Sequence, residues 1–204
     1  DIILGCFYLT KIEEEVLGHN MIFSSENEAI SAYDRGDIKL GAKIKVKILT
    51  GEIVETSAGR VIFNEIIPEE LRFINENMNK KTVAKLVDSV YRRYGTDRAA
   101  ELVDDLKDVG FKYAQKSGFT FAVEDIHVPT TKTKILNESE GQLDTIDKQY
   151  KRGLITEEER YAKTIELWMN AQGQIEKDMM SEYPKENDLF IVMTSGARGN
   201  VAQM

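Results

Sequence analysis

The sequence is short of the residues that build disulfides and zinc sites. Its 204 residues include one cysteine, Cys6, and two histidines, His19 and His127. A single cysteine cannot form an intrachain disulfide, and neither a Cys-x-x-Cys nor a His-x-x-Glu-His spacing can be written. The sequence therefore excludes a disulfide scaffold and a zinc site of these types, and we expect an intracellular protein.

Long apolar runs are also missing. No stretch approaches the ~20 apolar residues that a membrane-spanning helix needs, so no membrane partner is expected. The chain opens with DIILGCFYLT, which has neither an initiator methionine nor the pattern of a signal peptide. Because the sequence begins inside an apolar segment and stops soon after a short loop motif, we interpret both ends as cuts in a longer polypeptide.

Positive charge is in the minority. The chain has 27 lysines and arginines against 35 aspartates and glutamates, which gives a formal net charge of -8. A chain with this balance repels phosphate as a whole. Any contact with DNA or RNA is therefore expected to be local.

Apolar spacing and turn residues predict a first part that mixes helices and strands. Ser25 and Glu28 have the spacing of a capping box, and Gly36 would end the helix that they begin. Residues 42–49, AKIKVKIL, alternate apolar residues with lysine, which predicts a half-exposed strand. The other apolar segments predict helices at 79–95 and 96–118, with a restart at Gly110 left open, and strands at 119–129 and 190–193.

The region 134–180 has the repeat of a helical hairpin. Its apolar residues recur at spacings of four and three, the a/d pattern of helices packed along one seam. Gly153 would stop the first helix, and Thr156 with Glu159 would cap the second. So short a turn makes the helices antiparallel, and the predicted fold class is α+β: a mixed region of small strands and helices, then a long antiparallel coiled-coil hairpin. The expected seam residues are Leu136, Leu143, Ile146 and Tyr150, then Tyr161, Ile165, Trp168, Gln172, Ile175 and Met179.

Most charged groups fit ordinary structural roles. The acidic runs at 13–15, 104–105 and 157–159 fit solvated faces, because neighbouring carboxylates on a helix point about 100° apart. Other candidates keep two interpretations: a solvated strand face or a phosphate contact for Lys43, Lys45 and Lys47, and a strand-end or turn residue or a general base for His127.

The motif SGARG, residues 195–199, has the composition of a ligand loop. Gly196 and Gly199 allow a positive φ or a close approach of the backbone, and Arg198 between them offers a planar fork suited to phosphate. Five residues leave two interpretations open. The arginine contacts a phosphate, or it braces the loop against neighbouring backbone.

Several long stretches resemble the beta-prime subunit of bacterial RNA polymerase. DIILGCFYLT is similar to the family's QD-x-V-L-G-L-Y-Y-L-T, and TSAGRVIFNEIIPEEL is similar to TTVGRVIFNEILPE. GFKYAQKSGFTFAVEDIHVP resembles GFKYATRSGISIGIDDMVIP, and VMTSGARGNVAQM resembles MMADSGARGSAAQIRQLAG. The resemblance runs in order over essentially the whole chain. It departs at Thr194, where the family often has Asp, and at Asn200, where it has Ser.

The resemblance implies a role for each part. Residues 1–127 would form the pore region, which lines the route to the RNA 3′ end, and residues 128–204 the funnel region around the secondary channel, through which nucleotides enter. The hairpin, at about 134–180, would form the rim helices on which Gre-type transcript-cleavage factors and stringent-response factors dock. Arg198 would lie near the triphosphate of the incoming nucleotide. The docking tip would consist of Lys151, Arg152, Glu157, Glu158 and Glu159.

The resemblance also implies which parts of the reaction lie elsewhere. The family's metal-binding NADFDGD motif would precede this chain, and the bridge helix and trigger loop would follow it, so no catalytic residue or metal ligand is assigned here. The whole enzyme would be a cytoplasmic, nucleoid-associated DNA-directed RNA polymerase, a nucleotidyltransferase that uses Mg²⁺. Its partners would be the beta, alpha, omega and sigma subunits, template DNA, RNA and nucleoside triphosphates. This chain alone would be inactive.

A second class of function stays open beside the polymerase. The chain could act as a non-catalytic protein-interaction module, with a hairpin that binds partner proteins and an inert terminal loop. The two functions differ in whether the SGARG loop binds a nucleoside triphosphate.

Overall fold

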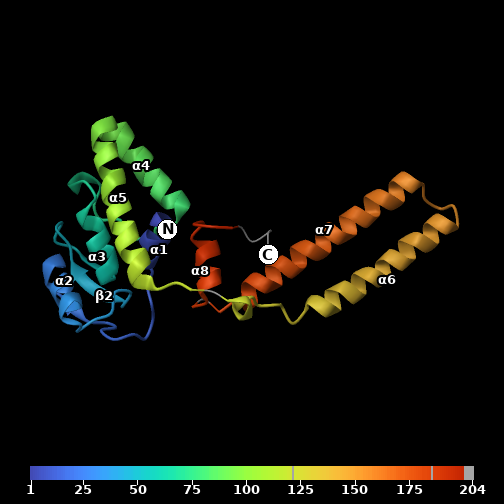
Figure 1. Ribbon diagram of the computed structural model, residues 1–204, viewed down its shortest axis with the longest axis horizontal. Helices are drawn as coiled ribbons and strands as arrows, with labels where there is room; N and C mark the ends of the chain where they lie inside the picture. Colours follow the sequence, from blue (N-terminus) through green and yellow to red (C-terminus); the bar gives the residue numbers. More distant parts are fainter. Residues whose placement is uncertain (121, 185, 200–204) are drawn as a thin grey trace. The chain divides into compact units, whose positions relative to one another are not determined.

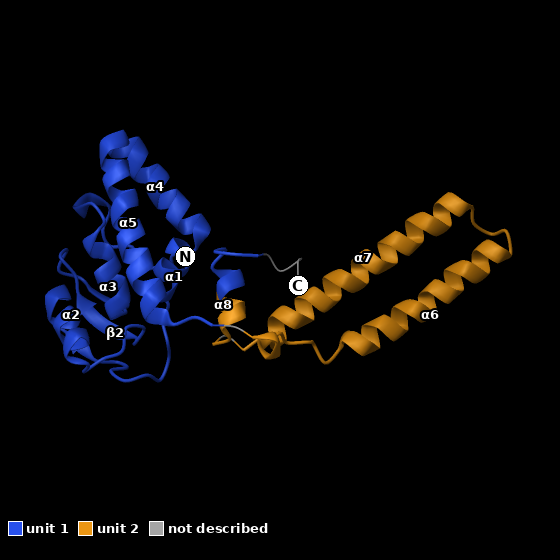
Figure 2. Ribbon diagram, viewed as in Figure 1, with its two compact units in different colours: residues 1–120, 192–200 blue, residues 121–191, 201–204 orange. Residues whose placement is uncertain are grey.

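The computed structural model describes residues 1–120, 122–184 and 186–199, which are mainly helical with one small sheet (Figure 1). The described residues divide into two compact units, 1–120 with 192–199 and 122–184 with 186–191 (Figure 2). This combination confirms the predicted α+β class. Within the described ranges, no helix is both long enough and apolar enough to cross a membrane.

The first unit contains a three-stranded sheet, whose strands lie between helices along the sequence. The strand order is β1-β2-β3, with β1 parallel to β2 and β2 antiparallel to β3. Its elements are α1 (Ile2–Thr10), β1 (Ile22–Phe23), α2 (Glu26–Arg35), β2 (Ile44–Lys47), β3 (Ile53–Thr56), α3 (Ala58–Glu65), the 3₁₀ turn Glu69–Leu71, α4 (Lys80–Tyr94) and α5 (Thr96–Ser117).

Strand β2 has the alternation that the sequence predicts. Ile44 and Val46 are fully buried, whereas Lys45 and Lys47 are exposed. Val46 lies opposite Val54 in β3, so the apolar face of the sheet continues across the two strands. The two lysines are therefore exposed on one face of the strand, and the choice between a solvated face and a phosphate contact stays a prediction.

Helix α1 runs through the core of the first unit, where Cys6 and Leu9 are fully buried. A Cβ on Gly5 would lie 1.8 Å from the carbonyl oxygen of Gly110, and a Cβ on Gly59 would lie 1.8 Å from that of Leu9. Side chains do not tolerate such distances, so only glycine lets α1 lie directly on the backbones of α5 and α3. Gly110 therefore marks a helix crossing inside a continuous α5.

Capping residues begin and end the helices as local chemistry predicts. The Ser25 hydroxyl accepts a hydrogen bond from the Glu28 N–H at 3.2 Å, and Gly36 ends α2 with a φ of 81°. On α4, Val83, Leu86 and Val90 are buried on one face. The helix predicted at 79–95 is confirmed, and these three residues form its apolar stripe.

The second unit is a hairpin of two antiparallel helices, α6 (Lys132–Lys151) and α7 (Glu157–Glu182), which lie side by side in Figure 1. The 3₁₀ turn Val123–Asp125 precedes the hairpin, and α8 (Asp188–Thr194) follows it. Thr156 and Glu159 form the predicted capping box at the start of α7, and Gly153 has a φ of 71° in the connecting turn.

The seam of the hairpin differs from the predicted one. In α7, Ala171 is buried at 5% exposure, whereas Trp168 is 37% exposed. The predicted seam is therefore wrong for four residues of α7, although Ile175 is half-buried and Met179 is buried as expected. The four are Tyr161, Ile165, Trp168 and Gln172, and Tyr150 in α6 is also exposed.

Side-chain size explains the displaced seam. Thr164 and Leu167 are half-buried and Ala171 is buried, so residues of small or moderate size line the inner side of α7. The predicted seam has the right spacing along α7 but lies on the wrong face of the helix. The prediction chose the largest apolar residues, whereas two helices approach most closely where side chains are small. The coiled-coil packing stays a prediction.

Two segments predicted as strands form other structures. Residues 190–193 belong to α8, whose start is capped by the Asn187 side chain through the N–H groups of Leu189 and Phe190. Among the described residues of 119–129, the one regular element is the 3₁₀ turn Val123–Asp125. The Asp125 carbonyl accepts from the Tyr183 hydroxyl and the Asn187 amide, so side chains replace a strand partner.

The new seam assignment can be tested at two adjacent positions. Ala171→Glu should destabilise the hairpin by roughly 3–5 kcal/mol, because it places an uncompensated charge at a buried position. Gln172→Glu is the matched control, and its exposed position predicts a change within about 0.5 kcal/mol. Circular-dichroism melting with hydrogen exchange of the α6 and α7 amides measures both. A larger loss in Gln172→Glu would restore the predicted seam.

Candidate functional site

The SGARG loop is a tight turn at the end of α8. The Ser195 side chain is buried; its hydroxyl donates to the Val192 carbonyl at 2.8 Å and accepts from the Ala197 N–H at 3.2 Å. Gly196 and Gly199 have φ values of 70° and 68°, in the left-handed region that favours glycine. The loop thus needs glycine at the two positions where the sequence has it.

The loop is attached to the start of α4. The N–H of Lys80, the first residue of that helix, donates to the carbonyl oxygen of Ser195 at 3.0 Å. A Cβ on Gly196 would lie 3.2 Å from the Cβ of Lys80, so the two backbones are in close contact. The sequence analysis missed Lys80, since nothing local marks a contact between segments so far apart in the chain.

The guanidinium of Arg198 points into solvent. Its side chain is 77% exposed, and one Nη atom lies 3.6 Å from an Asp1 carboxylate oxygen that is itself on an exposed side chain. An exposed ion pair of this length contributes little free energy, because water screens both charges. The arginine fork therefore stays accessible to a stronger anionic ligand.

At the hairpin tip, two of the five predicted docking residues have structural partners. Glu159 caps the helix, and the Glu157 carboxylate accepts from the Arg160 guanidinium at 2.5 Å, which lowers the pKa of Glu157. Arg160 also lies 3.5 Å from Asp147 and stacks over the ring of Tyr150. The sequence analysis missed this arginine, although its place three residues after Glu157 is a usable signal. The remaining docking residues, Lys151, Arg152 and Glu158, are exposed.

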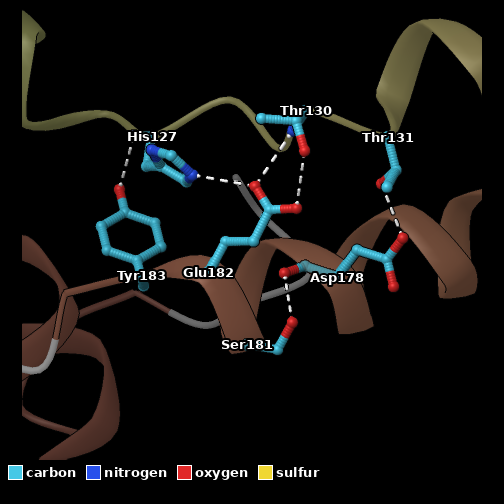
Figure 3. Close-up of polar contacts among 7 residues, drawn as sticks. All are labelled: His127, Thr130, Thr131, Asp178, Ser181, Glu182 and Tyr183. Atoms are coloured by element: carbon cyan, nitrogen blue, oxygen red, sulfur yellow. Dashed lines mark hydrogen bonds and ion pairs between the residues drawn. The ribbon is translucent and has the colours of Figure 1, made fainter.

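The root of the hairpin is held by a polar cluster that Figure 3 shows in detail. One oxygen of Glu182 accepts from the Thr130 N–H at 3.0 Å and lies 3.2 Å from His127 Nε2, and the other accepts from the Thr130 hydroxyl at 3.0 Å. The Tyr183 hydroxyl accepts from the His127 N–H, and Thr131 donates to Asp178 at 2.6 Å. We call these five contacts the root clamp. They give His127 structural partners in the irregular segment between the 3₁₀ turn and α6, and its two interpretations stay predictions.

Beside the root clamp lies an apolar groove of about 460 Å³. Trp168 lines this groove, although the sequence predicts it in the seam. The other lining residues come from the segment 126–129 before α6 and from α6 and α7 themselves. Its main apolar lining consists of Ile126, Val128, Leu136, Trp168, Ile175 and Met179.

Other reactive residues have structural surroundings. Burial raises the pKa of the Cys6 thiol to about 12, so this cysteine is a neutral core residue. Lys43 pairs with Glu55 at 2.7 Å, and Asp104 pairs with Lys107 at 3.0 Å on an exposed helix face. Over the described ranges, no three His, Cys, Asp or Glu side chains gather closely enough to hold a metal ion.

Comparison with known proteins identifies the family of the chain through its first 126 residues. Residues 1–126 match the family model described as RNA polymerase Rpb1, domain 3. The chain belongs to this family. Residues 127–204 lie outside the match, and the predicted division of the chain at residue 127 stays a prediction, since the first compact unit also includes 192–199.

Curated relatives extend the similarity of this Rpb1 domain 3 chain to its full length. It is 45% identical over 204 residues to "DNA-directed RNA polymerase subunit beta'" of Desulforamulus reducens, 43% over 206 residues to that of Moorella thermoacetica, and 42% over 204 residues to that of Desulforudis audaxviator. Each alignment covers 100% of this chain and 17–18% of the relative. The resemblance drawn from the sequence is confirmed, and the chain spans less than a fifth of these relatives' length.

The root clamp predicts a pH dependence. Donation from the Thr130 N–H, followed by the contact with His127, lowers the pKa of Glu182 below its usual value. Its ionised form therefore stabilises the folded hairpin above the unfolded glutamate pKa of ~4.3, and this contribution is lost as the pH falls through the lower folded pKa. We expect the melting temperature of the hairpin to drop below about pH 4.3.

A substitution separates Glu182 from the other carboxylates. Glu182→Gln should flatten the acid side of the melting profile followed by circular dichroism. Glu166→Gln changes an exposed carboxylate on the same helix and should leave the profile as it is in the wild type. Identical profiles for Glu182→Gln and the wild type would show that the clamp carries no ionic contribution.

Proposed function

We propose that this chain forms part of the wall along which nucleotides reach the active centre of a DNA-directed RNA polymerase. Residues 1–127 would form the pore region and residues 128–204 the funnel region around the secondary channel. The observation that carries the proposal is the SGARG loop, in which a buried serine and two positive-φ glycines support an exposed guanidinium. Similarity to beta-prime subunits over the full length of the chain, which includes this loop, supports its assignment to a polymerase.

In this proposal Arg198 contacts the triphosphate of the incoming nucleotide. Two Mg²⁺ ions, held by residues outside this chain, would neutralise part of the triphosphate charge in the whole enzyme. A guanidinium fork suits the remaining phosphate oxygens, and a glycine-flanked turn lets them approach without steric obstruction. The chain contributes a substrate-side cation and no metal ligand, so we expect it to lack polymerase activity by itself.

The whole enzyme would act in the cytoplasm, associated with the nucleoid. It would assemble from this subunit with beta, alpha, omega and sigma subunits on template DNA and RNA. The similarity to beta-prime subunits of DNA-directed RNA polymerases supports assembly with other polymerase subunits.

Single-nucleotide addition by an intact polymerase carrying this segment tests the Arg198 contact. Arg198→Ala should weaken the apparent nucleotide affinity by about 10- to 150-fold, because a charge-assisted phosphate contact contributes roughly 1.5–3 kcal/mol. Arg198→Lys keeps the charge and loses the fork, so its defect should be smaller. The rate is measured across nucleotide concentrations.

The alternative role of Arg198 gives a different result. If the arginine only braces the loop, Arg198→Ala should reduce assembly or stability and leave the concentration dependence unchanged. A correctly assembled Arg198→Ala enzyme with wild-type nucleotide response would therefore end the substrate-contact proposal.

The hairpin tip is the second proposed site, a docking surface for Gre-type cleavage factors and stringent-response factors. Its support is the exposure of Lys151, Arg152 and Glu158 around a turn held rigid by the Thr156 cap and the Glu157–Arg160 pair. A charged surface on a preformed turn favours fast, salt-sensitive association. Glu157 and Glu159 would act by keeping the tip in shape.

Charge reversal separates these two groups of tip residues. Lys151→Glu with Arg152→Glu should weaken binding of a cleavage factor in titration calorimetry, with a larger loss at low salt than at high salt. Both residues lie outside the capping box, so the start of α7 should be unaffected. Because Lys151 ends α6 and Arg152 is its C-cap, the two glutamates should weaken the last turn of α6 by about 0.3–1 kcal/mol each, so helicity should fall only slightly. Glu157→Gln should instead loosen the tip helix. Equal affinity of the wild type and the double reversal would place factor binding elsewhere.

The second candidate function is a non-catalytic interaction module that acts through the hairpin. The apolar groove beside the root clamp, with Trp168 at 37% exposure, is the observation that favours it. The two functions differ at the SGARG loop, since a pure interaction module gives no nucleotide response on substitution of Arg198.

A further inference from the structure

The first N–H group of α4 has a partner outside its own helix. The first four N–H groups of any helix lack intrahelical acceptors. The Asn79 side chain accepts two of them in α4, from Lys81 at 2.9 Å and from Thr82 at 3.1 Å. The Lys80 N–H is left to donate to the Ser195 carbonyl at 3.0 Å. The start of α4 thus holds the loop that carries Arg198.

The accepting residue is fixed on its own side as well. Ser195 is fully buried, and its hydroxyl ties the last turn of α8 to the N–H of Ala197. Gly196 follows with a positive φ, and a Cβ at this position would lie 3.2 Å from the Cβ of Lys80. The backbone from Ser195 to Ala197 therefore has little freedom, and Arg198 is the next residue.

We propose that Lys80 is a positioning residue for Arg198, acting through its backbone N–H and the carbonyl of Ser195. The consequence rests on the proposed function, in which Arg198 contacts a nucleoside triphosphate. A guanidinium that already faces its ligand loses less conformational entropy on binding than one on a free loop. The hydrogen bond between α4 and the loop is then part of the nucleotide affinity, although Lys80 itself touches no phosphate.

Proline at position 80 removes this one donor. Lys80 is the first residue of α4, the helical position that best tolerates proline, because its N–H has no intrahelical acceptor. The preceding Asn79 has φ -86° and ψ 176°, in the extended region that a residue before proline favours. Lys80→Pro therefore keeps the helix and places a ring carbon where the hydrogen bond to Ser195 was.

The experiment measures single-nucleotide addition across nucleotide concentrations in the intact polymerase. Lys80→Pro should raise the nucleotide concentration for half-maximal rate about three- to tenfold, the range expected for one lost hydrogen bond, with a smaller change in the maximal rate. Lys80→Ala removes the ammonium and keeps the N–H, so its effect should be smaller. In the Arg198→Ala background, Lys80→Pro should add little, because the group that it positions is gone.

Hydrogen exchange gives a readout independent of activity. In the intact enzyme without nucleotide, amides of residues 195–199 should exchange faster in Lys80→Pro than in Lys80→Ala. Should the proline variant fail to assemble, Gly196→Ala perturbs the same contact from the loop side. Its Cβ would lie 3.2 Å from that of Lys80 at a φ that disfavours alanine.

The outcomes separate this inference from the proposed function. If Arg198→Ala weakens nucleotide affinity while Lys80→Pro and Lys80→Ala behave alike in kinetics and exchange, the positioning role is wrong and the phosphate contact stands. If Arg198→Ala leaves nucleotide affinity unchanged, the phosphate contact fails, and the role of Lys80 in it fails too. Additive effects of Lys80→Pro and Arg198→Ala would also overturn the positioning role.

Discussion

The contact of α1 with the backbones of α5 and α3 is the constraint on which the first unit depends. Gly5 against Gly110 lets the helices touch without intervening side chains, and this holds α1 in the core. At that end, the buried Thr10 hydroxyl accepts from the Met78 N–H at 2.8 Å. The chain before α4 is thus fixed to α1, and the first N–H of α4 holds Ser195. The close helix contact at Gly5 is in this way connected, through Thr10 and the start of α4, to the loop that carries Arg198.

The hairpin relies on a different kind of contact. Its seam is lined by side chains such as Thr164 and Ala171, which bury little apolar area, and polar clusters hold both of its ends. Glu182 lies at the C-terminal end of α7, where the helix dipole disfavours a carboxylate. Three contacts from Thr130 and His127 offset that cost. The turn segment before α6 is therefore part of what keeps the two helices together.

Local chemistry made much of this fold predictable. The Ser25 cap, the Thr156–Glu159 capping box and the glycines that end α2 and α4 depend on residues within one turn of each other, so sequence spacing alone identifies them. The strand at β2 was equally clear, because Lys45 and Lys47 alternate with two buried residues. The stretches similar to the beta-prime family indicate the SGARG loop and the hairpin from the sequence alone.

The predictions failed where the structure depends on a residue that is distant in the sequence or has a small side chain. Trp168 has the right period for the seam, but the phase depends on how closely α6 approaches Ala171. Residues 190–193 have strand composition, but the Asn187 cap starts a helix there and 3.6-residue periodicity cannot develop in so short a run. The bond from Lys80 to Ser195 joins segments with no shared pattern, so no local rule finds it.

The root clamp also has a mechanical meaning. Helix α7 has 26 residues, so it extends for about 39 Å from its root to the tip, at about 1.5 Å per residue. With Glu182 at one end of this lever and Arg152 near the other, a rotation of about 5° at the clamp displaces the tip by roughly 3 Å. A change of a few tenths of an ångström in a hydrogen bond at the root can therefore move the tip far enough to make or break a contact there.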